Sequence, residues 1–175
     1  MNVQGVTFAN ADCGLVAGSG VTLTLGVVAH YCIDGKAYTQ AATAGIAPST
    51  TDLVTGVTLA GVPAGYGTVV VVGTTSGQSS TLRMVQGEIT QLDTNASAYH
   101  PGVFLTPPEF PDLPNDFCPL GYVIVKVATD YTAGAKYIFG SSNTTATGAQ
   151  STAATAHANT FVSLMGGIPT RPQIS

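Results

Sequence analysis

Apolar and polar residues alternate along much of this chain with the period of a β-strand. Val21, Leu23 and Leu25 alternate with Thr22 and Thr24, so the two sets would project from opposite faces of an extended segment. Similar short runs recur along the sequence, separated by turns rich in Gly, Pro and Thr, and they predict about eight to ten strands. The only candidate for a short helix, residues 34–47, has poor helical periodicity.

Two stretches predict particular strand environments. Val69–Val72 gives four consecutive apolar residues, so both faces of that strand should be covered, either within a sandwich or by a neighbouring subunit. Asp34-Gly35 lies between two half-apolar runs and predicts a β-hairpin with a type I′ turn. Together these patterns predict an all-β fold, which could be a sandwich, a jelly roll or a small barrel.

A proline-rich strip, residues 101–119, precedes an apolar run at 120–127 that has the pattern of a core strand. Each proline fixes φ and removes an amide donor, so neither a helix nor a central strand is expected in the strip. The strip should be extended and stiff, and it either clamps across its own domain or reaches a partner. Its apolar side chains are Phe104, Leu105, Phe110, Leu113 and Phe117.

The length of 175 residues predicts a single domain. Residues 1–20 are small and nearly uncharged, and we expect an extended N-terminal arm or an edge strand there. Residues 21–175 should form one β domain that includes the strip and a small-residue loop at 141–158.

Charged residues make up only 8% of the chain, where about 25% is typical of soluble domains. Such a surface is expected to be shared with copies of the chain or with partners, although a plain threonine-rich monomer is the alternative. The net charge is −4, and the five Lys and Arg residues are scattered. We therefore expect no nucleic-acid partner, because neutralising several phosphates requires clustered cations.

Three cysteines, Cys13, Cys32 and Cys118, form no CxxC pair. Their odd number favours free thiols in a protein that folds in a reducing cytoplasm. The 21 residues at 13–33 carry no Lys, Arg, Asp or Glu and are long enough to cross a bilayer. Their four glycines and strand period argue against insertion, so we expect neither a membrane partner nor a signal peptide.

Candidate chemistry is sparse. No GxSxG motif is present. His30 and Cys32 would share a strand face, and Cys118 or His100 could complete a zinc site, but a packed core explains these residues better. The sequence predicts no catalytic residue, no cofactor and no metal.

Paired carboxylates could form a glycosidase site. One group lies among the prolines, where acids usually serve as solvated loop residues, and the chain has no tryptophan to stack on a sugar. We therefore expect a protein that is not an enzyme. The acids concerned are Glu88, Asp93, Glu109, Asp112 and Asp116.

Four segments together resemble small virion structural proteins of tailed bacteriophages: "QGEITQLD" (86–93), "FPDLPNDFCPLGYVIVKV" (110–127), "YIFGSSN" (137–143) and "PTRPQ" (169–173). The resemblance extends over roughly residues 20–173 and includes no catalytic motif. It implies a β-rich protein on a phage particle, a capsid decoration (cement) protein that forms trimers.

The expected function is therefore structural: a homotrimer, assembled in the host cytoplasm, that binds the major capsid protein on the capsid surface and stabilises the lattice. The alternative is a tail or head fibre component that binds host-surface glycans through a Tyr- and Asn-lined site in the 141–158 loop. For the structural function we expect contacts from the arm and the strip, through Phe8, Leu15, Phe104, Leu105, Phe110, Leu113 and Phe117.

Overall fold

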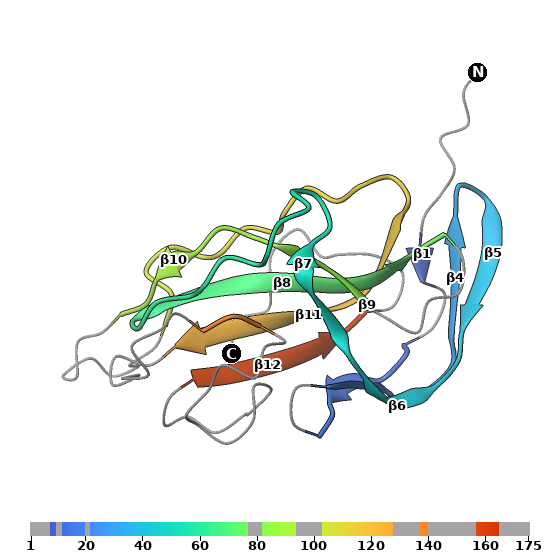
Figure 1. Ribbon diagram of the computed structural model, residues 1–175, viewed down its shortest axis with the longest axis horizontal. Coiled ribbons are helices and arrows are strands. Elements are labelled where there is room, and N and C mark those ends of the chain that lie inside the picture. Colours follow the sequence, from blue (N-terminus) through green and yellow to red (C-terminus); the bar gives the residue numbers. More distant parts are fainter. Residues whose placement is uncertain are drawn as a thin grey trace.

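The computed structural model describes residues 8–9, 12–19, 22–76, 82–93, 103–127, 137–139 and 157–164, and this part of the chain is all-β (Figure 1). The strands are arranged in three sheets with a sandwich-like packing, and none of the sheets closes into a barrel. Within the described residues there is no helix. The predicted all-β class is confirmed, and the sandwich is the alternative that the sheets form.

The strand bounds, in chain order, are β1 (Phe8–Ala9), β2 (Leu15–Ala17), β3 (Leu23–Leu25), β4 (Ala29–Ile33), β5 (Lys36–Gln40), β6 (Thr43–Ile46), β7 (Pro48–Asp52), β8 (Tyr66–Thr75), β9 (Leu82–Gln86), β10 (Thr90–Gln91), β11 (Phe117–Val127) and β12 (His157–Ser163).

The central sheet has the order β12-β11-β8-β9-β7, and β10 pairs with the beginning of β8. The longest strands, β8 and β11, are antiparallel neighbours, with Val70 opposite Val123. All four valines of Val69–Val72 are fully buried. The prediction of a strand covered on both faces is confirmed, since alternate valines enter two separate cores.

The smaller sheets have the orders β1-β4-β5 and β2-β3-β6. Asp34-Gly35 joins β4 to β5, and both residues have positive φ, 50° and 75°. A type I′ turn requires that conformation at both positions, so the predicted hairpin is confirmed. Tyr31 and Tyr38 face each other across it, with their rings stacked at 5.5 Å between centroids.

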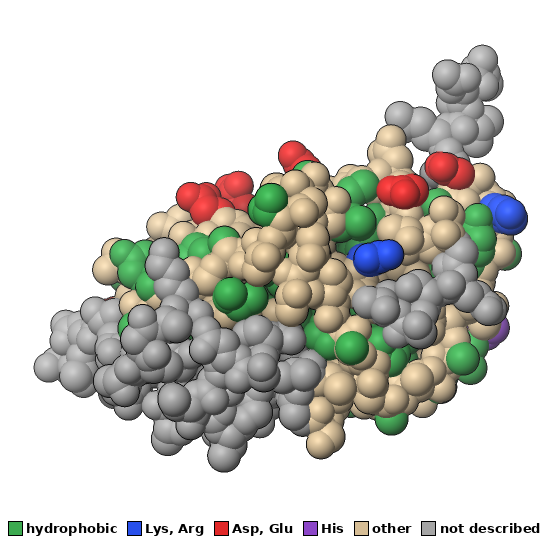
Figure 2. Space-filling view, in the orientation of Figure 1, with side chains coloured by type: hydrophobic (Ala, Val, Ile, Leu, Met, Phe, Trp, Pro, Cys, Tyr) green, Lys and Arg blue, Asp and Glu red, His purple; other side chains and the backbone are tan. Residues whose placement is uncertain are grey.

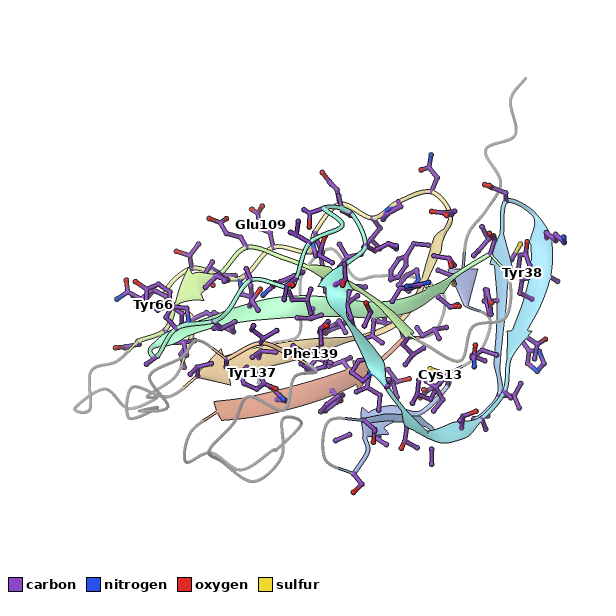
Figure 3. All side chains as sticks on the ribbon, viewed as in Figure 1. Cys13, Tyr38, Tyr66, Glu109, Tyr137 and Phe139 are labelled. Carbon is purple, nitrogen blue, oxygen red and sulfur yellow. The ribbon has the colours of Figure 1, made fainter. Side chains whose placement is uncertain are left out.

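Two hydrophobic cores lie on opposite faces of the central sheet. The first core contains Val70 and Val72 of β8 and joins them to Leu15, Leu23 and Ile33 of the smaller sheets. It also holds Tyr137 and Phe139, which Figure 3 places beside β11. The second core contains Val69 and Val71, on the opposite face.

The proline-rich strip covers the second core. Phe104 is buried there, and Phe110 and Leu113 pack against it half-buried. Phe110 meets the fully buried Tyr122 edge-on, at 5.0 Å between ring centroids. The strip was expected either to clamp across its own domain or to reach a partner, and the packing of these side chains shows that it clamps across its own domain.

The end of the strip differs from the expectation. Phe117–Pro119 is the beginning of β11, although the prolines were expected to prevent a central strand. The pairing of β11 with β8 shifts register between Pro119 and Gly121, and β12 pairs with β11 only from Gly121 onward. Proline is tolerated at such a bulge, at a point where β12 does not pair with β11, so its missing amide interrupts no described pairing between these two strands.

The described parts of the predicted N-terminal arm, residues 8–9 and 12–19, include two edge strands. β1 pairs with β4, and β2 pairs with β3. The edge-strand alternative therefore describes this part of the segment. The loop predicted at 141–158 lies outside the described residues, except for 157–158, which belong to β12.

Candidate interaction surface

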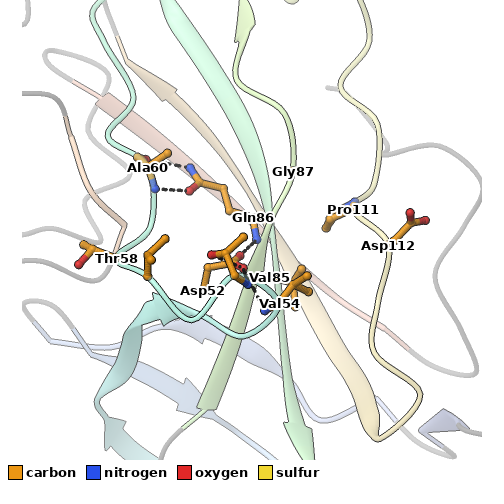
Figure 4. Close-up of a pocket in the computed structure, with 11 residues that line it drawn as sticks. Asp52, Val54, Thr58, Ala60, Val85, Gln86, Gly87, Pro111 and Asp112 are labelled. Carbon is orange, nitrogen blue, oxygen red and sulfur yellow. Dashed lines mark hydrogen bonds between the residues drawn. The ribbon is translucent and has the colours of Figure 1, made fainter.

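A groove of about 330 Å³ opens between the loop at residues 52–60 and the proline-rich strip (Figure 4). Val85 and Gly87, at the end of β9, lie between its two walls. Val54 and Val57 line it from the loop, and Pro111 lines it from the strip.

Asp52 fixes the first half of the loop. Its Oδ1 accepts hydrogen bonds from the backbone amides of Val54 and Thr55, at 3.0 and 2.8 Å. Its Oδ2 accepts a hydrogen bond from the backbone amide of Gln86 at 2.8 Å. The Asp52 amide also donates to the carbonyl of Val57. A buried carboxylate with these partners is a structural group that ties the loop to β9.

Gln86 fixes the second half of the loop. Its Oε1 accepts the amide of Ala60 at 2.6 Å, and its Nε2 donates to the carbonyl of Ala60 at 3.0 Å. The side chain thus replaces the two hydrogen bonds that a neighbouring strand would make. Because both halves are hydrogen-bonded to β9 residues or their neighbours, the backbone of the loop is restrained.

The rim of the groove combines apolar and acidic side chains. Val54 and Val57 are 56% and 62% exposed, and Asp112 stands exposed on the opposite wall. Glu88 and Glu109 are also exposed and flank Gly87 of the groove, since Glu88 follows Gly87 in the chain and a Cβ added at Gly87 would be 2.8 Å from the Glu109 carbonyl oxygen. Figure 3 shows Glu109 on the outer side of the strip, away from the sheet.

The structure corrects the prediction of interface residues for three positions. Leu15, Phe104 and Phe117 are buried within the protomer, so they have no surface to offer another subunit. Each is drawn inward because the central sheet has a core on both faces, which needs apolar cover from β2 and from the strip.

Other predicted contact residues remain accessible. Leu105 is 60% exposed, and Phe110 and Leu113 are half-buried. Phe8 lies in β1, and its side chain is outside the part that the structure describes. Sequence reasoning missed Asp52 and Gln86. The only available signal was an Asp ahead of Thr55-Gly56, which is typical of a turn in which the Asp side chain caps the backbone.

The candidate metal ligands do not converge. Within the described residues, no three His, Cys, Asp or Glu side chains form a group that could hold a metal ion. His30 is exposed on β4, where its Nδ1 lies 3.3 Å from the Thr39 hydroxyl. Cys118 is buried on β11, and His100 lies outside the described residues.

The two buried thiols, Cys13 and Cys118, are not poised for nucleophilic chemistry. Burial, together with the nearby Cys32 and Cys13, raises the pKa of Cys118 to about 12. Burial also raises the pKa of Cys13, whose Sγ donates to the Leu120 carbonyl at 3.5 Å. A thiol kept protonated is a poor nucleophile, so these residues act as core side chains.

The candidate glycosidase acids show no arrangement for catalysis in the described structure. Glu109, Asp112 and Asp116 are exposed on the strip, and Asp93 is half-buried after β10. A glycosidase needs two carboxyls that face each other across a substrate cleft, and exposed positions on the strip do not form such a pair.

No helix among the described residues is long and apolar enough to span a membrane. Comparisons of the chain with models of protein families, with curated proteins and with solved structures found no match.

Proposed function

We propose that this chain is a non-enzymatic structural subunit of a tailed-phage virion, a capsid decoration (cement) protein that binds the major capsid lattice as a homotrimer. The observation that carries the proposal is the exposed apolar rim of Val54 and Val57 beside an apolar groove. Exposed apolar side chains at a preformed hollow are typical of contact surfaces between proteins.

Two further observations support a role in assembly. Strands form most of the described chain, and the strip and smaller sheets brace the central sheet on both faces. Such a domain is suited to resist deformation in a lattice. The resemblance of segments 86–93 and 110–127 to small virion proteins of tailed phages points the same way, and low charge is common in interfaces between permanent partners.

The alternative of a glycan-binding fibre component has less support. A sugar site normally needs an accessible aromatic ring. All five tyrosines in the described part of the chain are buried or half-buried, namely Tyr31, Tyr38, Tyr66, Tyr122 and Tyr137.

Two experiments test the proposal. Sedimentation equilibrium of the purified protein should give the mass of three copies of the 17.6 kDa chain. Heads and tails from virions that lack the chain should then be incubated with it separately and pelleted. Binding to heads, with a higher melting temperature of the heads, is expected. A stable monomer that pellets with neither, or binding to tails alone, would refute the decoration function.

A further inference from the structure

We infer that the groove between the 52–60 loop and the strip is a docking surface for a different protein, one that presents an apolar side chain beside Lys or Arg. The inference deepens the proposed function and rests on it, because the capsid subunit is then the partner that must carry this chemistry.

The loop provides a preorganised apolar contact. Val54 and Val57 are exposed to solvent although Asp52 and Gln86 hold the loop on which they lie. A partner that covers them removes apolar surface from water without first ordering the loop, so little of the binding free energy is lost to conformational entropy. Pro111, on the opposite wall, has its backbone φ fixed by the ring, so this wall also loses little conformational entropy on binding.

The negative charge of the rim favours a partner with Lys or Arg beside its apolar side chain. Glu88, Glu109 and Asp112 are exposed, and in the described structure their carboxylates form no ion pair with a Lys or Arg side chain. Figure 2 shows acidic side chains along the upper edge of the molecule. An apolar group flanked by cations would satisfy both the groove and this rim.

The described part of a second copy of the chain offers few such cations. The whole chain has five Lys and Arg residues and a net charge of −4. Lys36 and Arg83 are its exposed cations in the described part, and Lys36 lies two residues from Asp34 at the hairpin tip. Contact of the rim with a sister subunit would bring like charges together, whereas a basic partner would be attracted.

The test uses a matched pair of variants. Val57→Asp adds a negative charge on the loop at the groove. Val27→Asp makes the same change at a similarly exposed position, 54% against 62%, in the turn between β3 and β4. We expect Val57→Asp to weaken binding to heads by about tenfold or more and Val27→Asp to leave it unchanged. Because both sites are exposed, both variants should fold, which their urea midpoints will verify.

Two charge measurements complete the test. Asp112→Asn should weaken binding to heads, and binding of the unmodified protein should weaken as NaCl rises from about 50 to about 500 mM, since screening lengths shorten over that range. A fluorescein-labelled decapeptide of alternating Val and Lys should bind the protein more tightly than one of alternating Val and Glu. This peptide arm uses no phage particle, so it tests the groove even if heads are not bound.

Several outcomes would overturn the inference. If Val57→Asp and Val27→Asp behave alike on heads that the unmodified protein binds, the groove is not the contact, while the decoration function stands. If neither peptide is preferred, or if salt has no effect, the partner does not have the proposed charge. If Val57→Asp instead dissociates the trimer, the groove is a contact between copies of the chain.

Discussion

Replacing Phe104 with Ala tests whether the proline-rich strip is a structural cover of the second core. Phe104 is 5% exposed, and its ring lies directly against the backbone of β8, since a Cβ added at Gly67 would be 2.7 Å from a ring carbon. Its neighbour Leu105 is 60% exposed on the same strip. The two adjacent residues thus provide an inward and an outward truncation at almost the same point.

The magnitude follows from burial. Truncation of a fully buried Phe to Ala costs about 3–5 kcal/mol in unfolding free energy, through lost transfer energy and the cavity left behind. The Lys126 ammonium lies 5.5 Å from the ring centroid, and this cation–π contact adds about 0.5 kcal/mol at a partly exposed site. Lys126 would regain hydration once the ring is gone, which offsets part of the loss, because burial lowers its pKa. We expect a net loss of about 3–4 kcal/mol.

Urea denaturation at fixed protein concentration is the assay, since the proposed self-association would make stability depend on concentration. With a slope of about 2 kcal/mol per molar urea, Phe104→Ala should lower the midpoint by about 1.5–2 M. Leu105→Ala should change the unfolding free energy by less than about 0.5 kcal/mol. Equal shifts for the two variants, or a loss below about 1 kcal/mol for Phe104→Ala, would show that the strip does not cover the core.

Three more predictions concern the thiols and a close backbone contact. In the native protein, the half-buried Cys32 should react with a thiol reagent first, and Cys13 and Cys118 only on unfolding; three equally fast thiols would contradict their burial. The pKa of Cys118 is raised in the folded state from 9.0 to about 12, so its contribution to stability should be intact below about pH 9 and lost as the pH rises toward 12. The urea midpoint measured over this pH range should therefore fall more steeply for the unmodified protein than for Cys118→Ala. Gly73→Ala would push a methyl group into the Cys118 carbonyl and the Phe117 ring and should cost about 2–3 kcal/mol, whereas Gly26→Ala, where the new Cβ meets only ordinary contacts, should be nearly neutral; equal melting temperatures would contradict the close approach.

Features determined by short stretches of sequence could be predicted. Asp34-Gly35 specifies its own turn because both residues tolerate positive φ. Val69–Val72 indicates cover on both faces because alternate side chains point in opposite directions. Neither inference requires knowledge of the tertiary contacts that these residues make.

Features that depend on distant contacts could not be predicted. The groove exists because Asp52 meets the amide of Gln86, 34 residues later in the chain, and no local pattern indicates which residue this carboxylate reaches. Leu15 was expected at an interface because its surroundings are small and uncharged, but β3 and β11 enclose it. The orientation of the strip was left open for the same reason: prolines indicate stiffness, but not which side faces the domain.

The strip's role inside the protomer accounts for its prolines. A cover that lacks the hydrogen-bond ladder of a strand must obtain its order from another source, and prolines reduce the entropy that docking of the strip would lose. Phe104 is buried, and Phe110 and Leu113 pack half-buried against the second core, so less of their surface is left for a partner. The exposed valines of the 52–60 loop remain beside it, on a loop whose order comes from Asp52 and Gln86. Truncating Phe104 should therefore affect folding, because its side chain is buried, while charging Val57 should affect the proposed binding, because its side chain is exposed.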